Sequence, residues 1–231
     1  MSLATIEEHT LLTRPLGPDA VVLDLGANVG VFSVAMAHRF GCVCHAVEPN
    51  PAMRDQIPEN PRIQVHPFAM GARAGEETLH VSTDPLGSSL IPTDALGYTR
   101  TLTVSVQTLP GLMRQEGMER VDLVKADIEG AEIPMLEACS DGDLSRIDQF
   151  SIEFHDFNGT TPVEDVVRTL DRFRDLGFAV YRKARYAHYD VLILHPGRLG
   201  VSKAELAWIR TGRHYLTGMG RLVQKRIRAL M

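Results

Sequence analysis

A glycine turn and an acidic residue near the start of the chain have the spacing of a nucleotide-cofactor site. The apolar run 21–25 contains Asp24 and leads into the turn Gly26-Ala27-Asn28-Val29-Gly30. Apolar residues at helical spacing follow, so this stretch predicts a buried strand, a tight turn and a helix N-terminus. A second apolar run, 42–47, ends at Glu48, 22 residues after Gly26. An acidic side chain at that distance can accept hydrogen bonds from ribose hydroxyls.

The sequence of the turn narrows the class of cofactor. A dinucleotide site needs G-x-G-x-x-G to hold a pyrophosphate, but Asn28 stands in place of the middle glycine. The Gly-Lys-Ser/Thr of a P-loop is also absent from the turn. Asp24 would repel a phosphate but can pair with an ammonium group. We therefore expect S-adenosylmethionine, which has an amino-acid end and an adenosine end. An α/β turn without a ligand is the alternative.

Further acidic residues and a histidine end two more predicted strands. Asp127 directly follows the run 121–126. Glu153 lies near the end of the segment 148–154, and His155 directly follows that segment. Ligands of open α/β sheets bind beyond the carboxyl ends of the strands, so these side chains are expected near the reactive atom of the cofactor. Histidine is the usual general base near neutral pH. We expect His155 to act as the base, oriented or charge-balanced by Asp127 or Glu153.

A metal site is a second interpretation of the same residues. Asp127 and Glu153, with Asp156 as a further ligand, could hold a Mg²⁺ ion that binds a substrate diol, because hard oxygen ligands suit that ion. Glu129 and Glu132 fall in the first turn of the next predicted helix, where the helix dipole also favours acids. Their role stays open. The remaining histidines show no metal-ligand spacing and are expected to be structural.

Alternation of predicted strands and helices indicates an α/β fold with a doubly wound, mostly parallel sheet. The predicted strands are 21–25, 42–47, 63–68, 121–126, 148–154, 178–183 and 190–195. A short polar connection before the last strand predicts a closing antiparallel hairpin. The clearest helix follows Thr161-Pro162-Val163-Glu164, a capping box with proline at the first helical position, and ends at Gly177. Residues 1–19 are expected to form a short helical lead-in, and 72–106 an inserted β-hairpin or flap over the cofactor edge.

The composition is that of one α/β domain with a sizeable core: 231 residues, 44% hydrophobic, net charge −5. The chain gives no general case for nucleic-acid binding, and no apolar stretch approaches the length of a transmembrane helix. Three cysteines are expected to be buried thiols, and no signal peptide is recognised, so we expect a cytoplasmic protein. Residues 201–231 carry a net charge of +6. A capping box, Ser202–Glu205, predicts that a helix begins this basic extension of a 1–200 domain. The extension is either a solvated face or a surface for oligomerisation or docking.

The order of these motifs resembles the FkbM family of S-adenosylmethionine-dependent methyltransferases. The segments that carry the resemblance are VLDLGANVGVFS, VEPN, DLVKADIEGAE and IEFH, with Ser88-Ser89-Leu90 in the insertion. The resemblance implies the Rossmann-like, seven-stranded class I methyltransferase fold with an antiparallel last strand, and O-methylation of a hydroxyl on a sugar, glycan or natural product. It also implies cofactor contacts. The residues concerned are Asp24, Gly26, Ala27, Asn28, Gly30, Glu48, Pro49, Phe68, Ala69, Met70 and Asp127.

Two other classes of function remain open at the level of sequence. A dehydrogenase of the dinucleotide-binding type would share the strand order and Glu48, but it needs another glycine and a substrate domain. A non-catalytic cofactor-binding protein is possible if the acidic residues are structural. Nothing in the sequence identifies the methyl acceptor.

Overall fold

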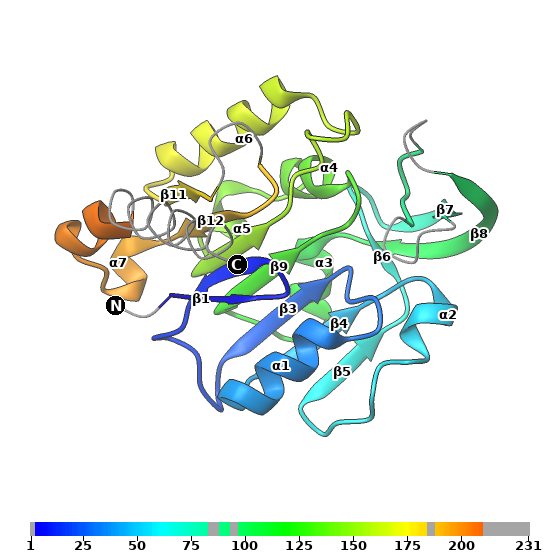
Figure 1. Cartoon of the computed structure of the whole chain (residues 1–231), viewed down its shortest axis with the longest axis horizontal. Helices are drawn as coiled ribbons and strands as arrows, with labels where there is room; N and C mark the ends of the chain where they lie inside the picture. The colour runs from blue at the N-terminus through cyan, green and yellow to red at the C-terminus, as the bar shows by residue number, and fades with distance from the viewer. Residues whose placement is uncertain (1–2, 83–87, 93–96, 184–187, 210–231) are drawn as a thin grey trace, which may run out of the picture.

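The fold is built on a seven-stranded sheet, seen in a computed structural model that describes residues 3–82, 88–92, 97–183 and 188–209 (Figure 1). The strands are β3 (Val21–Leu25), β4 (Val43–Val47), β5 (Ile63–His66), β9 (Leu123–Ala126), β10 (Gln149–Ile152), β11 (Ala179–Arg182) and β12 (Val191–Leu194). Their order across the sheet is β11-β12-β10-β9-β3-β4-β5. All seven predicted strands are therefore confirmed.

The direction of the strands also follows the prediction. β5, β4, β3, β9 and β10 run parallel to one another. β12 lies antiparallel between β10 and β11, so the last strand closes the sheet as expected. The order reverses between β3 and β9, and an open α/β sheet binds its ligands at such a switch point.

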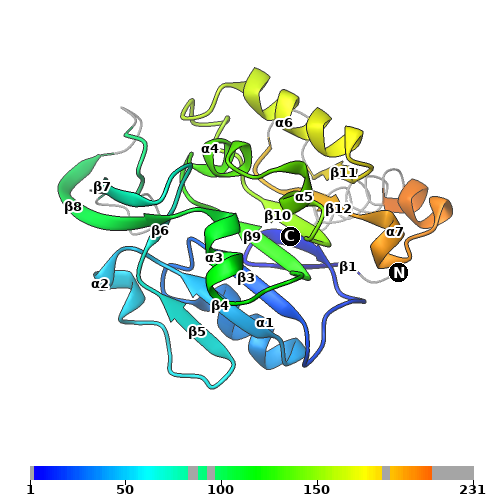
Figure 2. The same cartoon turned by 180° about the vertical axis from the view of Figure 1, so that it is seen from behind.

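The two faces of the sheet are covered differently. One face packs on α3 (Leu109–Gln115), α4 (Glu132–Glu137) and α6 (Val163–Asp175) in the main hydrophobic core. The other packs on α1 (Val31–Phe40) and on the hairpin of β1 (Leu3–Ile6) and β2 (His9–Leu12). Figure 1 views the second face, and Figure 2 views the molecule from behind, where α3 lies in front of the sheet. Three further helices are short: α2 (Pro51–Arg54), α5 (Asp141–Leu144) and α7 (Pro196–Leu199).

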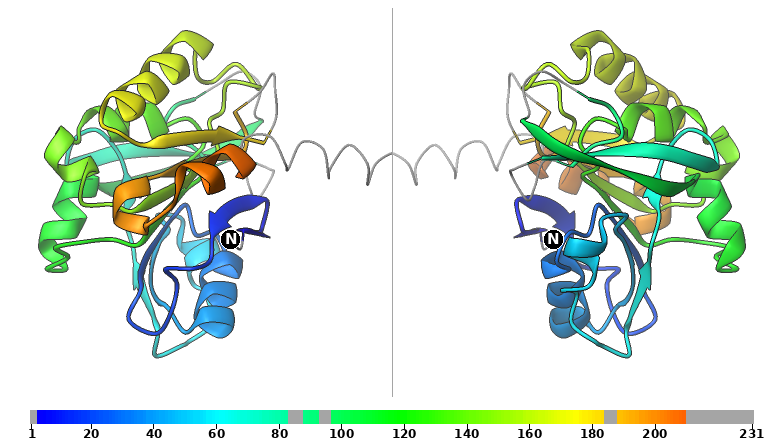
Figure 3. Two further views of the ribbon diagram at one scale, coloured as in Figure 1. Left: turned by 90° about the vertical axis from the view of Figure 1, so that its left-hand side faces the viewer. Right: turned by 90° about the vertical axis from the view of Figure 1, so that its right-hand side faces the viewer.

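The insertion forms a small sheet of its own, as predicted. β7 (Gly75–Ser82) and β8 (Tyr98–Gln107) pair as an antiparallel hairpin, and β6 (Ala69–Met70) pairs in parallel with β8. The hairpin projects from one end of the main sheet, and the right panel of Figure 3 looks onto it. Its apolar side chains form a separate cluster around Leu79 and Val104.

The helical lead-in predicted for residues 1–19 is wrong. These residues contain the β1–β2 hairpin, whose Leu11 and Leu12 are fully buried. The hairpin is stabilised by the main sheet: the side-chain amide of Gln149 accepts from Leu12 N at 2.9 Å and donates to Leu12 O at 3.1 Å. Long-range packing of this kind decides the conformation of short segments whose local pattern is ambiguous.

Of the two capping boxes predicted at helix N-termini, one is absent and one is present. α6 begins at Val163 with Pro162 as its N-cap, no side chain caps it, and Thr161 Oγ1 finds no hydrogen-bond partner. The predicted capping box and the predicted place of the proline are therefore wrong, although Gly177 does follow the helix end with φ +84°. The box at Ser202 is confirmed, because Glu205 N donates to Ser202 Oγ and Ser202 N donates to Glu205 Oε2.

The C-terminal extension begins as part of the domain. Residues 203–209 are helical, and Ile209 is buried against a cluster that includes Leu12 and Leu192. The second helix predicted from about Arg221 lies outside the described residues. The three cysteines are free and buried, as expected. Within the described part of the chain, none of the helices is long and apolar enough to cross a membrane.

Candidate active site

The turn after β3 adopts a conformation that only some residues tolerate. Gly26 has φ +76°, and a Cβ there would lie 1.9 Å from the carbonyl oxygen of Asp127. Asn28 has φ +50°, in the left-handed region that asparagine tolerates better than most residues. Gly26 N and Ala27 N donate to Val47 O at 3.1 and 3.0 Å, which ties the turn to the end of β4. Gly30, with φ +81°, is the N-cap of α1.

Glu48 is held beside this turn by two backbone hydrogen bonds. Its Oε2 accepts from Asn28 N at 2.9 Å and its Oε1 from Asn50 N at 2.8 Å, and the residue is 7% exposed. Burial raises the pKa of the carboxyl, and the two amides oppose that rise. A carboxylate has about four lone-pair sites. The two amides use two of them, so the others remain for donors in the adjoining cavity.

A cavity of about 520 Å³ opens at the carboxyl ends of the parallel strands. Eight of the predicted site residues line it: Gly26, Ala27, Asn28, Glu48, Pro49, Ala69, Asp127 and Glu153. Met70 lines it as well. This volume lies within the range of small-molecule and cofactor sites, roughly 300–1,000 Å³.

Other predicted residues lie outside the lining of this cavity. Gly30 begins the helix behind the turn. Phe68 packs on the main core and against the ring of His66, with centroids 5.4 Å apart, whereas its neighbours Ala69 and Met70 line the cavity. The direct role predicted for Phe68 is therefore not supported by its position.

Asp24 lies beneath the turn and is fully buried. Its Oδ2 accepts hydrogen bonds from the amide and hydroxyl of Ser33 at 3.2 and 2.7 Å, and its Oδ1 lies 3.2 Å from Lys125 Nζ. The Asp24 carboxylate is therefore paired with the ammonium group of Lys125, a residue of the protein itself. The predicted direct contact with a cofactor ammonium is corrected to a structural ion pair under the turn.

Lys125 is a site residue that the sequence interpretation missed, since it sits within an apolar strand. Its Nζ donates to Gly26 O at 2.7 Å and lies 4.0 Å from Asp127 Oδ2. Burial opposes charge on the ammonium, but the carboxylates of Asp24 and Asp127 outweigh burial and raise the pKa of Lys125. A charged lysine therefore joins the glycine turn to the end of β9.

Asp127, Glu153 and His9 face one another in the cavity, with ligand atoms within 4.8 Å of each other. Burial opposes ionisation of Asp127, but His9, Lys125 and His155 hold its pKa below the usual range. For Glu153 the balance is reversed: burial and the charge of Asp127 raise its pKa to about 7. One carboxylate of the pair is thus fixed in the ionised form, while the other can exchange a proton near neutral pH.

His155 has a different environment from the one predicted for a general base. It is 3% exposed and does not line the cavity. Its Nδ1 lies 3.1 Å from Glu132 Oε1, and its Nε2 lies 3.2 Å from Glu129 Oε2 and 3.6 Å from Asp127 Oδ1. Burial opposes its charge, but hydrogen bonds to Glu129 and Glu132 outweigh burial and raise its pKa to about 11. An imidazolium with both nitrogens engaged cannot take a proton at neutral pH.

Asp156 is not part of the carboxylate cluster. Its Oδ2 lies 2.6 Å from His188 Nδ1, its Oδ1 accepts from His188 N at 3.2 Å, and its side chain is 3% exposed. The predicted use of Asp156 as a Mg²⁺ ligand is therefore corrected. The group that Asp127 and Glu153 do form includes His9, a nitrogen ligand, rather than a third hard oxygen.

The N-terminal hairpin contributes residues that no sequence signal identified. Its two-residue turn, Glu7-Glu8, lines the cavity together with His9. Both glutamates have positive φ, as in the type I′ turn that normally carries Asn-Gly. The non-glycine residues with positive φ in the described chain are Glu7, Glu8, Asn28 and Glu129, and all four line this cavity. Backbone strain is thus concentrated at the site, a common property of functional sites.

The inserted hairpin contributes residues to the same cavity. Leu79, Ser88 and Leu90 are among its lining residues. Ser89 Oγ donates to Glu129 O at 2.5 Å, and Ser89 forms a two-way backbone bridge with His80. The insertion is therefore fastened to the strained loop after β9.

The sequence is similar to known methyltransferases. Residues 24–180 match the Methyltransferase FkbM domain family. The chain is 28% identical over 199 residues to 31-O-demethyl-FK506 methyltransferase FkbM of Streptomyces tacrolimicus, covering 71% of this chain and 75% of that protein. It is 26% identical over 206 residues to AMB antimetabolite synthetase AmbE of Pseudomonas aeruginosa, covering 71% of this chain. The chain spans only 10% of AmbE.

Among solved structures, precorrin-6y C5,15-methyltransferase from Geobacter metallireducens aligns with a TM-score of 0.40 and 13% identity. The alignment covers 77% of this chain and 79% of that one. The family match includes the glycine turn, Glu48, Asp127, Glu153 and His155. The chain belongs to the FkbM methyltransferase family.

Proposed function

We propose that the chain transfers a methyl group from S-adenosylmethionine to a hydroxyl of a sugar, glycan or natural product. One observation carries the proposal: a single cavity combines the glycine turn and Glu48 with a carboxylate pair of divergent pKa, Asp127 and Glu153. Two acidic groups whose environments separate their pKa values typically have distinct roles in proton transfer.

The lining of the cavity fits a cationic cofactor. Six carboxylates line it (Glu7, Glu8, Glu48, Asp127, Glu129 and Glu153), against one ammonium, that of Lys125. Such a lining attracts a sulfonium and an α-ammonium group and disfavours the pyrophosphate of a dinucleotide. Glu48 would accept the ribose hydroxyls with its remaining lone pairs, Ala69 and Met70 would flank the adenine, and the turn 26–30 would line the methionine end. When bound, the cofactor supplies an electrophilic methyl carbon.

Glu153 is the residue that we assign as general base, in place of His155. A hydroxyl is a poor nucleophile at neutral pH, so its proton must leave as the new carbon–oxygen bond forms. With a pKa of about 7, the Glu153 carboxylate accepts that proton at physiological pH. Asp127 stays ionised and accepts a hydrogen bond that orients the acceptor. His155 acts as a positioning residue, because its charge holds Glu129 and Asp127 in place.

The acceptor can be sought with the purified chain. Incubation with S-adenosylmethionine and a panel of hydroxylated metabolites should yield a product heavier by one methylene, and Glu153→Gln should lose that product. Glu59→Gln, at an exposed position, is the matched control. A product formed equally by the Glu153→Gln variant would contradict the assigned base. Methylation confined to amines or thiols would contradict O-methylation.

A further inference from the structure

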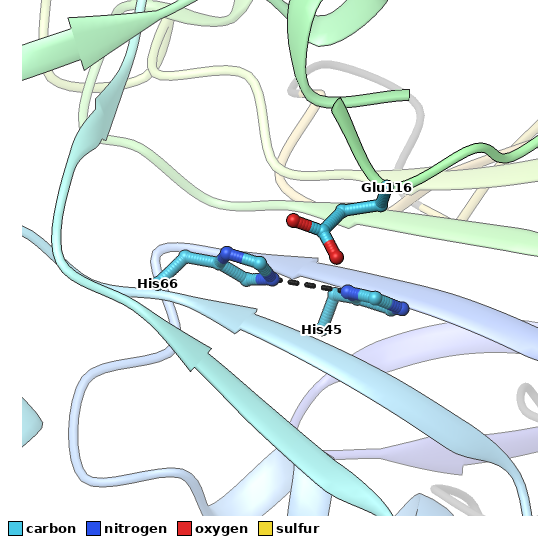
Figure 4. Close-up of side chains that lie close together, drawn as sticks. All are labelled: His45, His66 and Glu116. Atoms are coloured by element: carbon cyan, nitrogen blue, oxygen red, sulfur yellow. Dashed lines mark hydrogen bonds between the residues drawn. The ribbon is translucent and has the colours of Figure 1, made fainter. Parts of the chain in front are cut away.

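Two histidines and a glutamate meet outside the cavity, on neighbouring elements. His45 lies in the middle of β4, His66 ends β5, and Glu116 is the C-cap of α3. None of the three lines the cavity described above. Figure 4 shows the two rings end to end, with the carboxylate of Glu116 directed toward them.

The geometry places three potential ligand atoms around one point. His45 Nδ1 and His66 Nε2 are 3.0 Å apart, and a Glu116 oxygen lies within 4.8 Å of both. The ring planes differ by 15° and the centroids are 5.2 Å apart. That separation, with nitrogens in contact, means that the rings meet edge to edge, so the lone pair of one nitrogen faces the other ring.

We propose that His45, His66 and Glu116 bind a Zn²⁺ ion, with water completing a four-coordinate site. Two imidazole nitrogens and one carboxylate oxygen are a ligand set that zinc takes in proteins. The same set does not suit Mg²⁺ or Ca²⁺, which prefer oxygen ligands. Nitrogens bound at about 2.0–2.1 Å in tetrahedral geometry lie about 3.3 Å apart, so the two rings need to separate by a few tenths of an ångström. Each ring must also turn by roughly 35° so that both nitrogens point toward a shared ion on the Glu116 side instead of at each other.

Neighbouring side chains orient the Glu116 carboxylate, and the partial exposure of Glu116 gives an ion access to the site. Gln64 Nε2 donates to Glu116 Oε2 at 2.8 Å, and Gln115 Nε2 donates to Glu116 Oε1 at 3.1 Å. Hydrogen bonds to a ligating carboxylate fix its orientation, as outer partners commonly do at metal sites. His45 and His66 are 6% and 4% exposed, whereas Glu116 is half-buried, so an ion would enter from the Glu116 side.

Such an ion would join the end of α3 to the paired strands β4 and β5. β4 and β5 pair in the sheet, and α3 packs above them. A ligand that binds the folded chain alone stabilises it by mass action. Zinc should therefore raise the melting temperature, while the cavity and its carboxylates remain separate from the metal.

The test uses the full chain, stripped with a chelator and dialysed. Titration with Co²⁺, a spectroscopic substitute for Zn²⁺, should give the visible absorption of a four-coordinate site, and Zn²⁺ should displace it. Glu116→Gln should weaken Zn²⁺ binding by about 10- to 100-fold in calorimetry, the range seen when a group supporting or completing a metal site is lost. Glu116 is partly exposed, so this variant should fold. His66→Gln should abolish the signal.

Two controls separate this site from others. His38→Gln changes an exposed histidine of α1, and Glu153→Gln changes the carboxylate cluster of the cavity, so both should retain the Co²⁺ signal. Loss of the signal in Glu153→Gln alone would assign the metal to the cavity and overturn the proposal. Absence of binding to the wild-type chain would leave a buried histidine–histidine hydrogen bond and would also overturn it. In a zinc-soaked crystal, an anomalous peak between His45 and His66 is the expected result.

Discussion

At the scale of residues, His155 and Glu153 lie in contrasting environments, and the proposed chemistry of the site rests on that contrast. The two residues are close in sequence, but only Glu153 lines the cavity. Carboxylates surround His155 and raise its pKa to about 11, whereas burial and Asp127 raise that of Glu153 to about 7. Residue type alone favours histidine as the base. The charge balance around each group reverses that preference.

Replacing Glu153 by glutamine should therefore lower the rate of methyl transfer by about 10²-fold or more, the usual contribution of a general base. Cofactor affinity should change little, because Glu48 and the turn are untouched. In the wild-type chain, the rate at saturating substrate should rise with pH through an inflection near pH 7, where Glu153 loses its proton. Single-turnover kinetics across pH would show whether that inflection disappears in the variant; if it persists, another group is the base.

His155→Gln should act mainly on stability. The folded-state pKa of His155 is about 11 and its ordinary value is 6.5, so its stabilising charge is fully present below pH 6.5 and is lost as pH rises toward 11. Removing it leaves the buried Glu132 and the partly buried Glu129 without their cation, which should cost about 3 kcal/mol at pH 7. Urea unfolding of both proteins at pH 6 and pH 9 measures the effect. A difference between them that does not shrink at the higher pH would contradict a charged His155.

Glu48→Gln tests the cofactor end of the cavity. The amide retains one acceptor oxygen but loses the charge and half of the accepting capacity, so binding of S-adenosylhomocysteine should weaken by roughly 1.5–3 kcal/mol. Isothermal titration measures the affinity, and circular dichroism checks that the variant folds. Unchanged affinity in a folded variant would remove Glu48 from the ribose site.

At the scale of elements, the β1–β2 hairpin has a turn whose sequence does not suit its conformation. Glu7 and Glu8 have φ +44° and +67°, which asparagine and glycine adopt at lower cost. Each strained residue costs on the order of 1 kcal/mol or more. The turn lines the cavity, so we interpret the strain as retained for contacts with the acceptor.

The double variant Glu7→Asn, Glu8→Gly should therefore be more stable than the wild type, by about 1 kcal/mol. It should also have a raised KM for the acceptor, with unchanged affinity for S-adenosylhomocysteine. Chemical unfolding and steady-state kinetics give the two quantities. A more stable variant with wild-type KM would show that the turn has no part in acceptor binding.

Much of this element plan can be predicted from the chain. Apolar runs locate all seven strands of the main sheet, since a buried parallel strand needs such a run. The helix predicted for residues 1–19 is wrong because Glu7-Glu8 lacks the sequence signature of a turn. The hairpin that forms there also depends on hydrogen bonds to Gln149, which is distant in sequence. The glycine turn, Glu48 and Asp127 can be predicted because their position follows from strand ends. The role of Lys125 and the protonation of His155 cannot be predicted from the sequence, because both depend on charged groups that only folding brings together.

At the scale of the whole molecule, the described part of the proposed cofactor site lies before the C-terminal extension. Every described residue that lines the cavity lies between Glu7 and Glu153. Removing residues 210–231 should therefore leave affinity for S-adenosylhomocysteine unchanged, while Ile209 keeps its place in the core. Light scattering and calorimetry of the truncated chain measure oligomeric state and affinity. A truncated chain that folds but no longer binds would place part of the site beyond the described residues.

We propose above that the acidic cavity at the carboxyl end of the sheet binds S-adenosylmethionine, and this binding can be measured directly. The most direct test is calorimetric titration of the wild-type chain with S-adenosylhomocysteine, and separately with NAD. We expect one S-adenosylhomocysteine to bind per chain and NAD not to bind, because carboxylates line the cavity and the turn lacks the glycines of a pyrophosphate site. Binding of NAD, or failure of the folded chain to bind S-adenosylhomocysteine, would contradict it.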